Sequence, residues 1–287
     1  MSDNGLIWSF SFDGSDKKVE YDAKYDRTDI TQSFWERAYL YGPYIYIDST
    51  ATGTDHLLRF NVETKEMEDL TKKNRNYINP FYFYNGMIYG WAADGGTRCV
   101  ADMDLKNVEL DENPVSPYCS TGNYLVGEVR GEEIDPSWGI PFRIGIEIYN
   151  LKTKERVQIL NETLGMESIE IIGATDQYIY FYDSKRVSFG TITITVGGVE
   201  REATVTKWND GKIWRMNLDG TNIVCVYDNI AYDLTTNAVF YEDRIVMQGK
   251  FIGIEDGKKK VWGGPLQVAV INEDGTFGEF REVEVVG

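Results

Sequence analysis

The chain has 287 residues with 29 basic and 46 acidic side chains, so its formal net charge is -17. Such a surface repels phosphate backbones and anionic lipid, which argues against nucleic-acid binding and against binding to a membrane surface. Aromatic residues make up 14% of the chain, and 28 Gly stand against 7 Pro. This composition favours half-buried strands joined by many tight turns.

The termini and the cysteines exclude further classes. No apolar run approaches the length of a membrane span, so we expect no membrane insertion. Residues 1–5 lack the basic region and apolar core of a signal peptide, and a cytoplasmic location is the default expectation. Cys99, Cys119 and Cys225 are odd in number and far apart, which is not a disulfide framework. We expect Cys225, inside an apolar strand, to pack as a small hydrophobe.

A strand–turn–strand pattern recurs along the chain. Residues 7–15 align without a gap on residues 213–221, residues 60–66 align on residues 149–155, and residues 270–276 are a looser copy of the first. Asp-Gly at the tip, as in Asp219-Gly220, suits a tight turn because glycine accepts positive φ. A second pair of strands lies upstream of most of these, as in residues 44–49 and 178–184. Together the two pairs make a unit of four strands, A to D.

Five complete units follow one another, starting near Trp35, Tyr77, Val115, Ser168 and Ala238. They predict an all-β fold, a β-propeller of four-stranded antiparallel blades, with about five full blades over residues 35–287. We expect residues 1–287 to form a single domain. No segment has the pattern of a long amphipathic helix.

Residues 6–22 supply only strands C and D, so they predict an N-terminal half-blade. A lone pair of strands exposes unpaired edges, and such edges favour association. Three explanations stay open: the chain is a piece of a longer parent, the ring contains an incomplete blade, or a second molecule completes the pairing, so that the chain self-associates.

Loop lengths indicate which face of the fold is elaborated. The A–B and C–D turns are tight, whereas the B–C connections expand at residues 130–142, 185–210 and 250–265. The middle expansion alternates polar and apolar residues around Gly197-Gly198, which predicts an inserted hairpin. Because loops on a rigid scaffold commonly carry binding, we expect a binding face formed by the B–C and D–A loops.

The candidate residues of that face are Trp91, Arg130, Glu132, Glu133, Asp135, Trp138, Trp208 and Trp262. Exposed tryptophans beside carboxylates can stack on sugars or anchor a protein partner. The competing interpretation is that each tryptophan covers the core under its own loop. The run of lysines at residues 258–260 is interpreted as a solvated hairpin tip.

Catalytic and metal-binding signatures are absent from the sequence. His56 is the only histidine, and neither a catalytic triad nor a zinc site can be built around it from the neighbouring residues. A calcium site near Asp102 and Asp104 stays open, although these residues lack the ligand order of a calcium loop. No glycine-rich loop has the residues that hold phosphate. The sequence therefore predicts no catalytic residue, cofactor site or metal site. Glycoside hydrolysis needs only two carboxylates and stays open, with Glu132, Glu133 and Asp135 as the first acids to test.

Residues 213–221 and 178–180 also carry a resemblance. They resemble bacterial propeller domains of unknown function related to the YWTD propellers of low-density-lipoprotein receptors and, more distantly, the TolB-type propellers. The Tyr-Trp-Thr-Asp tetrad itself does not occur, so receptor-style ligand recognition does not carry over. The resemblance implies a binding or assembly module.

The sequence thus predicts a non-enzymatic binding or interaction module with a protein or glycan partner. Two alternatives remain: a carbohydrate-binding or glycoside-hydrolase-like propeller that uses the same face, and a structural segment of a longer surface protein.

Overall fold

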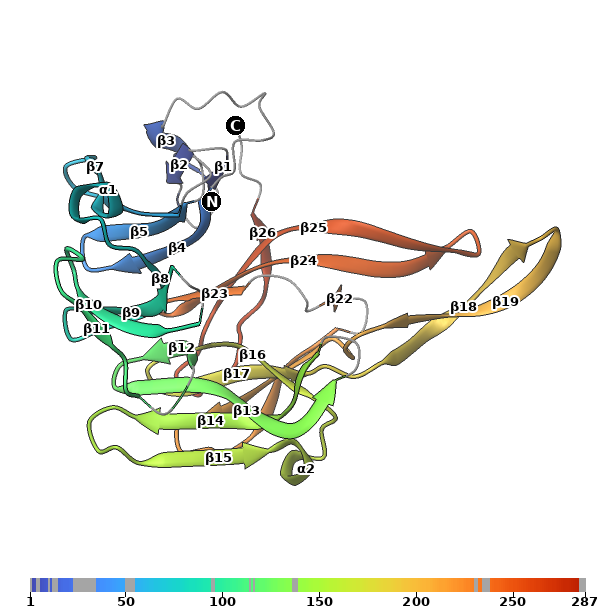
Figure 1. The fold of residues 1–287 in the computed structure, drawn as a ribbon. Coiled ribbons are helices and arrows are strands. Elements are labelled where there is room, and N and C mark those ends of the chain that lie inside the picture. Colours follow the sequence, from blue (N-terminus) through green and yellow to red (C-terminus); the bar gives the residue numbers. More distant parts are fainter. Residues whose placement is uncertain are drawn as a thin grey trace. The chain divides into compact units, whose positions relative to one another are not determined.

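The computed structural model describes residues 2–3, 6–9, 11, 15–22, 35–49, 55–93, 96–113, 115, 117–135, 139–229, 232–233 and 238–283. Most of these residues lie in strands, and two short helices are present among them (Figure 1). Contacts divide the chain into two compact units, residues 1–114 with 285–287 and residues 115–284.

Unit 1 contains three antiparallel sheets. The N-terminal sheet consists of β1 (Ser2–Asp3), β2 (Leu6–Ser9) and β3 (Lys18–Asp22). Blade 1 consists of β4 (Trp35–Tyr41), β5 (Tyr44–Ser49), β6 (His56–Asn61) and β7 (Met67–Asp69). After helix α1 (Leu70–Asn74), blade 2 consists of β8 (Ile78–Tyr84), β9 (Met87–Ala92), β10 (Arg98–Asp102) and β11 (Val108–Leu110).

Unit 2 contains three blades and a separate hairpin. Blade 3 consists of β12 (Pro117–Thr121), β13 (Tyr124–Asp135), β14 (Ile140–Asn150) and β15 (Arg156–Leu160), and helix α2 (Asn161–Leu164) follows. Blade 4 consists of β16 (Ile169–Ala174), β17 (Tyr178–Asp183), β20 (Lys212–Asn217) and β21 (Val224–Asp228). Between β17 and β20, β18 (Val187–Val196) and β19 (Val199–Lys207) form a two-stranded sheet.

Blade 5 has a divided first strand. Both β22 (Tyr232–Asp233) and β23 (Ala238–Tyr241) pair with β24 (Arg244–Glu255), which continues to β25 (Lys258–Val270) and β26 (Arg281–Val283). The short β22 pairs near Phe251 and β23 pairs near the start of β24. The expectation of a β-propeller with five four-stranded antiparallel blades is confirmed.

The cores of both units lie between successive sheets. In unit 1, one cluster joins blades 1 and 2 through Tyr46, Ile78 and Ile88, and a smaller one packs the N-terminal sheet on blade 1 through Ile47 and Leu58. Buried faces between neighbouring sheets are what a propeller blade requires, since each blade has two apolar faces.

In unit 2, the side chains of strand β17 pack into two cores, one on each face of the strand. Ile179 and Phe181 pack into the cluster shared with blade 3, whereas Tyr180 and Tyr182 pack into the cluster shared with blade 5. Successive side chains of a strand point to opposite faces, so a strand buried on both sides reads as a continuous apolar and aromatic run.

Two details differ from the sequence-based expectation. The N-terminal sheet was expected to hold only two strands, but Ser2–Asp3 adds a third along Leu6–Ser9. The expansions expected as loops at residues 130–142 and 250–265 largely continue strands, because both carry residues that alternate across a pleated sheet. The segment 185–210 contains the hairpin β18–β19.

Candidate binding surface

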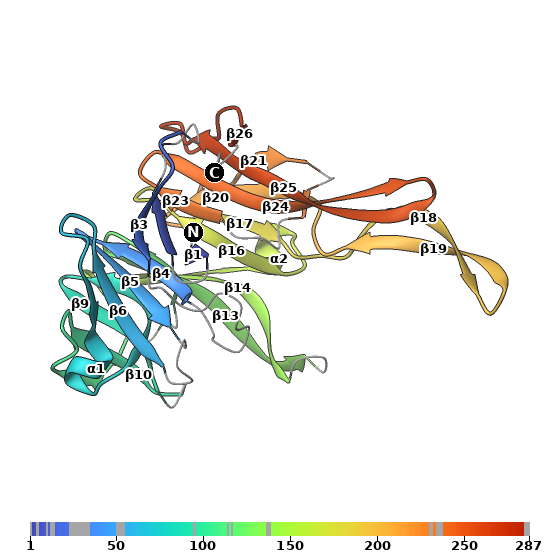
Figure 2. The ribbon, with the colours of Figure 1, turned by 90° about the horizontal axis from the view of Figure 1, so that it is seen from above.

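Three hairpins of unit 2 extend the B–C connections of blades 3, 4 and 5. They are β13–β14, β18–β19 and β24–β25, and we call them the extended hairpins. The pairing of β24 with β25 runs from Arg244 and Val270 out to Glu255 and Lys258. In Figures 1 and 2, β18–β19 and β24–β25 run out from their blades to the same side. By contrast, the A–B connections described in both units are turns of two or three residues, and the C–D connections hold five or six residues in blades 1 to 4 and ten in blade 5.

The β18–β19 and β24–β25 hairpins both close with a two-residue turn. Gly197 and Gly198 have φ of 60° and 81°, and Asp256 and Gly257 have φ of 50° and 69°. A type I′ turn needs positive φ at both central residues, and its twist matches that of the strands it joins. Asp256-Gly257 between alternating apolar residues is therefore the sequence signal that identifies β24–β25 as a hairpin.

The β18–β19 and β24–β25 hairpins touch near the root of the first and the tip of the second. A Cβ atom on Gly190 would lie 2.5 Å from Cδ1 of Ile254, so the absence of a side chain at Gly190 allows this close approach. A hollow of about 490 Å³ beside it is lined by Gly253, Ile254, Glu255 and Lys260. The two hairpins thus form one continuous surface.

The three extended hairpins expose large apolar side chains. Of the eighteen such side chains exposed in the described part of the chain, ten lie on or directly beside the extended hairpins: Ile134, Phe142, Ile144, Ile194, Val196, Val199, Trp208, Ile254, Val261 and Val270. Exposed apolar groups that cluster on one surface mark contact sites more reliably than groups scattered singly.

An ion-pair network fixes the root of the first hairpin. Arg130 donates to Glu128, and the Nε of Arg143 lies 2.9 Å from the same carboxylate. The Nη1 of Arg143 also lies 3.0 Å from Oε1 of Glu170 in blade 4, whose other oxygen accepts a hydrogen bond of 2.8 Å from the Tyr182 hydroxyl. Burial, and then the Glu170 charge, raise the pKa of Tyr182. The network joins β13 and β14 to the neighbouring blade.

A second network lies at the root of β18–β19. The Nζ of Lys185 is 2.9 Å from Oδ2 of Asp183 and 3.7 Å from Oδ2 of Asp210. The guanidinium of Arg186 lies 5.4 Å from the ring centre of Trp208, whose residue is 60% exposed. A cation over an exposed indole holds the ring in place while one face stays accessible.

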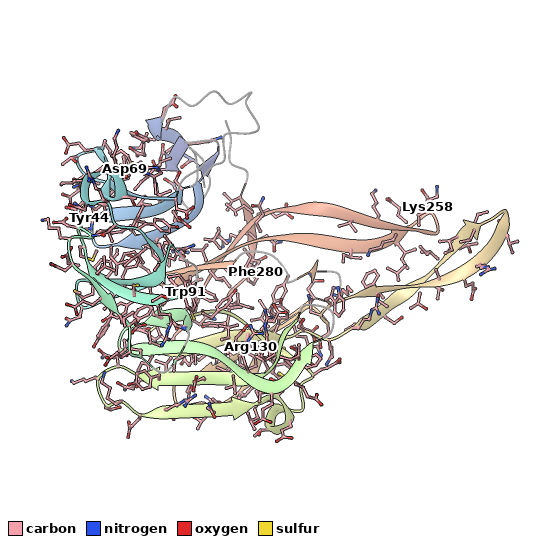
Figure 3. The ribbon with its side chains drawn as sticks, in the orientation of Figure 1. Tyr44, Asp69, Trp91, Arg130, Lys258 and Phe280 are labelled. Carbon is pink, nitrogen blue, oxygen red and sulfur yellow. The ribbon has the colours of Figure 1, made fainter. Side chains whose placement is uncertain are left out.

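Four of the predicted site residues whose side chains are described lie on or beside the extended hairpins. Arg130, Glu132 and Glu133 lie on β13, where both glutamates are exposed, and Trp208 follows β19. Figure 3 shows Arg130 close to the blades and Lys258 at the far end of β24–β25.

The other predicted residues contribute differently. Trp91 belongs to β9 in unit 1, is half-buried, and makes an edge contact with Phe81 at 5.7 Å, so it packs within its own blade. Asp135 ends β13 and Trp262 lies in β25, but only their backbones are described. Trp138 lies outside the described residues. Sequence reasoning missed Arg143 and Glu170, whose spacing carries no local motif.

The titratable residues considered for chemistry serve local structure. Nδ1 of His56, at the start of β6, lies 2.8 Å from Oδ2 of Asp69. The Asp102 carboxylate accepts backbone hydrogen bonds from Asp104, Lys106 and Asn107, which closes its own turn. Within the described ranges, no three His, Cys, Asp or Glu side chains gather as metal ligands do. Nor does any helix there combine the length and apolar content needed to cross a membrane.

No family model matches the sequence, and no curated protein matches it. Among solved structures, TolB from Acinetobacter baumannii is similar, with 12% identity over 96% of this chain and 61% of that chain and a TM-score of 0.48. An oligogalacturonate lyase from Vibrio parahaemolyticus has 13% identity over 98% of this chain and 73% of that chain, with a TM-score of 0.49.

An oligogalacturonate lyase in complex with manganese has 13% identity over 84% of this chain and 61% of that chain, with a TM-score of 0.45. The chain thus spans about three fifths (61%) of the length of TolB and of this lyase. These likenesses say nothing about what the present chain binds.

Proposed function

We propose that this chain is a non-enzymatic binding module that contacts its partner through the extended hairpins of unit 2. The observation that carries the proposal is the concentration of exposed apolar side chains on strands that reach beyond the blades. Covering apolar surface drives association, and a sheet ribbon without a second layer has that surface available.

The roots of the hairpins support the same role. The ion pairs among Arg130, Arg143, Glu128 and Glu170 hold β13–β14 against blade 4. Because Gly190 has no side chain, β18–β19 packs closely against Ile254. A binding surface held on rigid elements loses less conformational entropy when a partner binds. Both carboxylates of the network accept hydrogen bonds from arginine, an arrangement that stabilises structure and favours a scaffold over an acid–base pair.

Site-specific photo-cross-linking tests the proposal. A photoreactive residue at Ile134, Ile194 or Ile254 is expected to yield discrete cross-linked products in the source cell. The matched control is Val239, which is 59% exposed but lies on β23 within a blade. Equal or stronger products from position 239, with none from the hairpins, would contradict the assignment of the surface.

A glycan-binding module is the second candidate, favoured by Trp208 because an exposed indole face can stack on a sugar ring. A glycan array with the wild type and Trp208→Ala, run beside a hydrolase panel, separates the two. Glycan binding that depends on Trp208 without turnover favours the lectin. Turnover lost on replacing Glu132 or Glu133 favours a glycoside hydrolase.

A further inference from the structure

The outer edge of β18 is free of strand partners within the described part of the chain, where β18 pairs with β19 alone. In that pairing Val196 lies opposite Val199, directly beside the type I′ turn. Residues that flank such a turn exchange hydrogen bonds, and hydrogen-bonded pairs then alternate along the strand. Thr191, Thr193 and Thr195 therefore direct their N–H and C=O groups to the outer edge.

This edge has a symmetric sequence. It runs without irregularity from Gly190, after a bulge, to Val196, before the turn, and its centre is Thr193. The stretch from residue 191 to residue 195 reads the same in both directions: Thr191-Ile192-Thr193-Ile194-Thr195. Two antiparallel copies centred on Thr193 would set each threonine against a threonine and each isoleucine against an isoleucine. A two-fold interface requires this kind of self-complementarity.

We propose that a second copy of this chain pairs with the outer edge of β18, so that two β18–β19 hairpins form one four-stranded antiparallel sheet across a two-fold axis. The inference rests on the proposed function, because it takes the extended hairpins as the contact surface. It identifies the partner as a second copy of this chain. Each outward threonine would exchange a pair of hydrogen bonds with the other copy.

The apolar face of the hairpin supports this pairing. Gly190, Ile192, Ile194 and Val196 share one face, and Ile254 packs over that face at Gly190. At the tip, Val196 stays 51% exposed. In the proposed register Val196 of one copy lies opposite Gly190 of the other and so reaches the other copy's Ile254 and the hollow beside it. In this arrangement the tip of each β18–β19 hairpin would be covered by the root of the same hairpin in the other copy.

Charge also favours contact at this surface. The chain carries a net charge of -17, yet residues 187–207 hold two acidic and two basic side chains, and residues 244–270 hold two acidic and five basic ones. Two copies repel each other least where these hairpins meet. Glu200 and Glu202 lie on β19, so equivalent glutamates would be three strand spacings apart, about 14 Å, which exceeds the screening length of about 8 Å in physiological salt.

The edge also lacks the features that keep edge strands apart. Natural edge strands carry lysine, proline or inward charges, whereas residues 190–196 are uncharged and mostly β-branched. A contact one strand wide is smaller than the roughly 800 Å² per partner of a standard interface. We therefore expect a dimer whose population rises with protein concentration.

Sedimentation velocity over a concentration series tests the inference on the full chain. The wild type is expected to move from monomer to dimer, and Thr193→Pro is expected to stay monomeric because proline removes an outward N–H without breaking the pairing to β19. The control is Thr204→Pro, the same substitution on the outer edge of β19, opposite Thr191. It is expected to dimerise like the wild type.

Disulfide trapping gives an independent readout. Thr193 would lie on the axis, where facing Cα atoms are about 5.5 Å apart, within disulfide reach. Oxidised Thr193→Cys should give a covalent dimer, and Thr204→Cys should not. The native thiols are common to both variants, and burial raises the pKa of the Cys119 thiol to about 12.

Three results would overturn the inference: a wild type that is monomeric at every concentration, a dimer that survives Thr193→Pro, or equal trapping at positions 193 and 204. A monomeric wild type whose hairpin positions still cross-link to another protein would sink this inference and leave the proposed function standing. Absence of hairpin cross-links to any protein, with no dimer, would sink both.

Discussion

At the scale of single residues, the repeat persists because polar side chains close equivalent turns in the same way. The Oδ1 of Asn61 accepts hydrogen bonds from the N–H groups of Glu63 and Thr64. Asn150 does the same for Lys152 and Thr153 in blade 3. Such side-chain hydrogen bonds to the local backbone need no distant partner, which is why the turns could be aligned from sequence.

The Asp274-Gly275 turn, which lies between β25 and β26 of blade 5, also packs on blade 4. Gly275 has a φ of 77°, and a Cβ there would lie 2.6 Å from Cδ2 of Tyr178 in blade 4. The Tyr180 hydroxyl donates a hydrogen bond of 3.1 Å to the Gly275 carbonyl oxygen. The glycine is thus required both by the turn and by the close approach of the next blade.

Gly275→Ala is therefore expected to lower the free energy of unfolding by about 2–4 kcal/mol, the sum of left-handed strain and a clash with the ring. Gly122→Ala is the control, because Gly122 has a φ of 51° and nothing within 4 Å of its Cβ position. Gly122→Ala should lower the free energy of unfolding by about 1–2 kcal/mol, from backbone strain alone. Urea unfolding of both variants measures the difference, and equal losses would refute the packing argument.

At the scale of elements, blades 1 and 4 share a pairing across strands B and C. Tyr46 faces Arg59 and Tyr180 faces Arg215 in the two registers. The two guanidinium groups lie 5.0 Å and 4.7 Å from the ring centres of Tyr44 and Tyr178. The recurrent Tyr-x-Tyr pattern predicted these strands, but the cation–π contacts depend on cross-strand register and could not be predicted from either strand alone.

The N-terminal sheet is tied to blade 1 by an ion pair. Both carboxylate oxygens of Glu20 in β3 are engaged, one 2.8 Å from Nζ of Lys18 and the other 2.8 Å from Nζ of Lys65 in the C–D turn of blade 1. Ser9 also donates to it at 2.6 Å. Lys18, then Lys65 and Ser9, lower the pKa of Glu20 from 4.5 to about 2.

Because the pKa of Glu20 is lower in the folded state, its ion pairs stabilise unit 1 above about pH 4.5 and cease to do so as the pH falls towards 2. Exposed ion pairs are weak, so we expect a contribution of about 1 kcal/mol or less. Urea unfolding between pH 2.5 and 6 should show a smaller pH dependence for Glu20→Gln than for the wild type. Glu63→Gln is the control. The same pH dependence of the free energy of unfolding in the wild type and both variants would contradict a stabilising role of the Glu20 ion pairs.

The order of strands was predictable because each blade carries its own turns and apolar alternation. The expected starts at Trp35 and Ala238 coincide with β4 and β23, and the expected start at Tyr77 lies one residue before β8. The division of the first strand of blade 5 was not predictable. It depends on which residues pair along β24, and a two-residue strand has no periodicity to read.

At the scale of the whole molecule, the blades hold the buried cores and the extended hairpins reach beyond them. The sequence predicted where the extended hairpins lie, because the three expansions are visible as lengths. It did not predict the network around Arg143, because Glu170 and Tyr182 come from the next blade and only folding brings them to β14. Networks between blades are long-range in sequence and therefore carry no local motif.

A shortened hairpin separates scaffold from surface. Gly190 and Val205 are cross-strand partners, so removing residues 191–196 and 199–204 lets Gly197-Gly198 close the hairpin at that pair. The deleted residues contribute little to the buried core of the blades. The shortened chain is therefore expected to unfold within about 0.5 kcal/mol of the wild type, as exposed changes generally do.

The most direct test measures urea unfolding and the cross-links from a photoreactive residue at position 254 on the full and the shortened chain. We predict the same unfolding transition, with cross-linked products reduced on the order of tenfold, which corresponds to about 1.4 kcal/mol of binding free energy. Full cross-linking by the shortened chain, or its failure to fold, would contradict the division of the molecule into a scaffold and a contact surface.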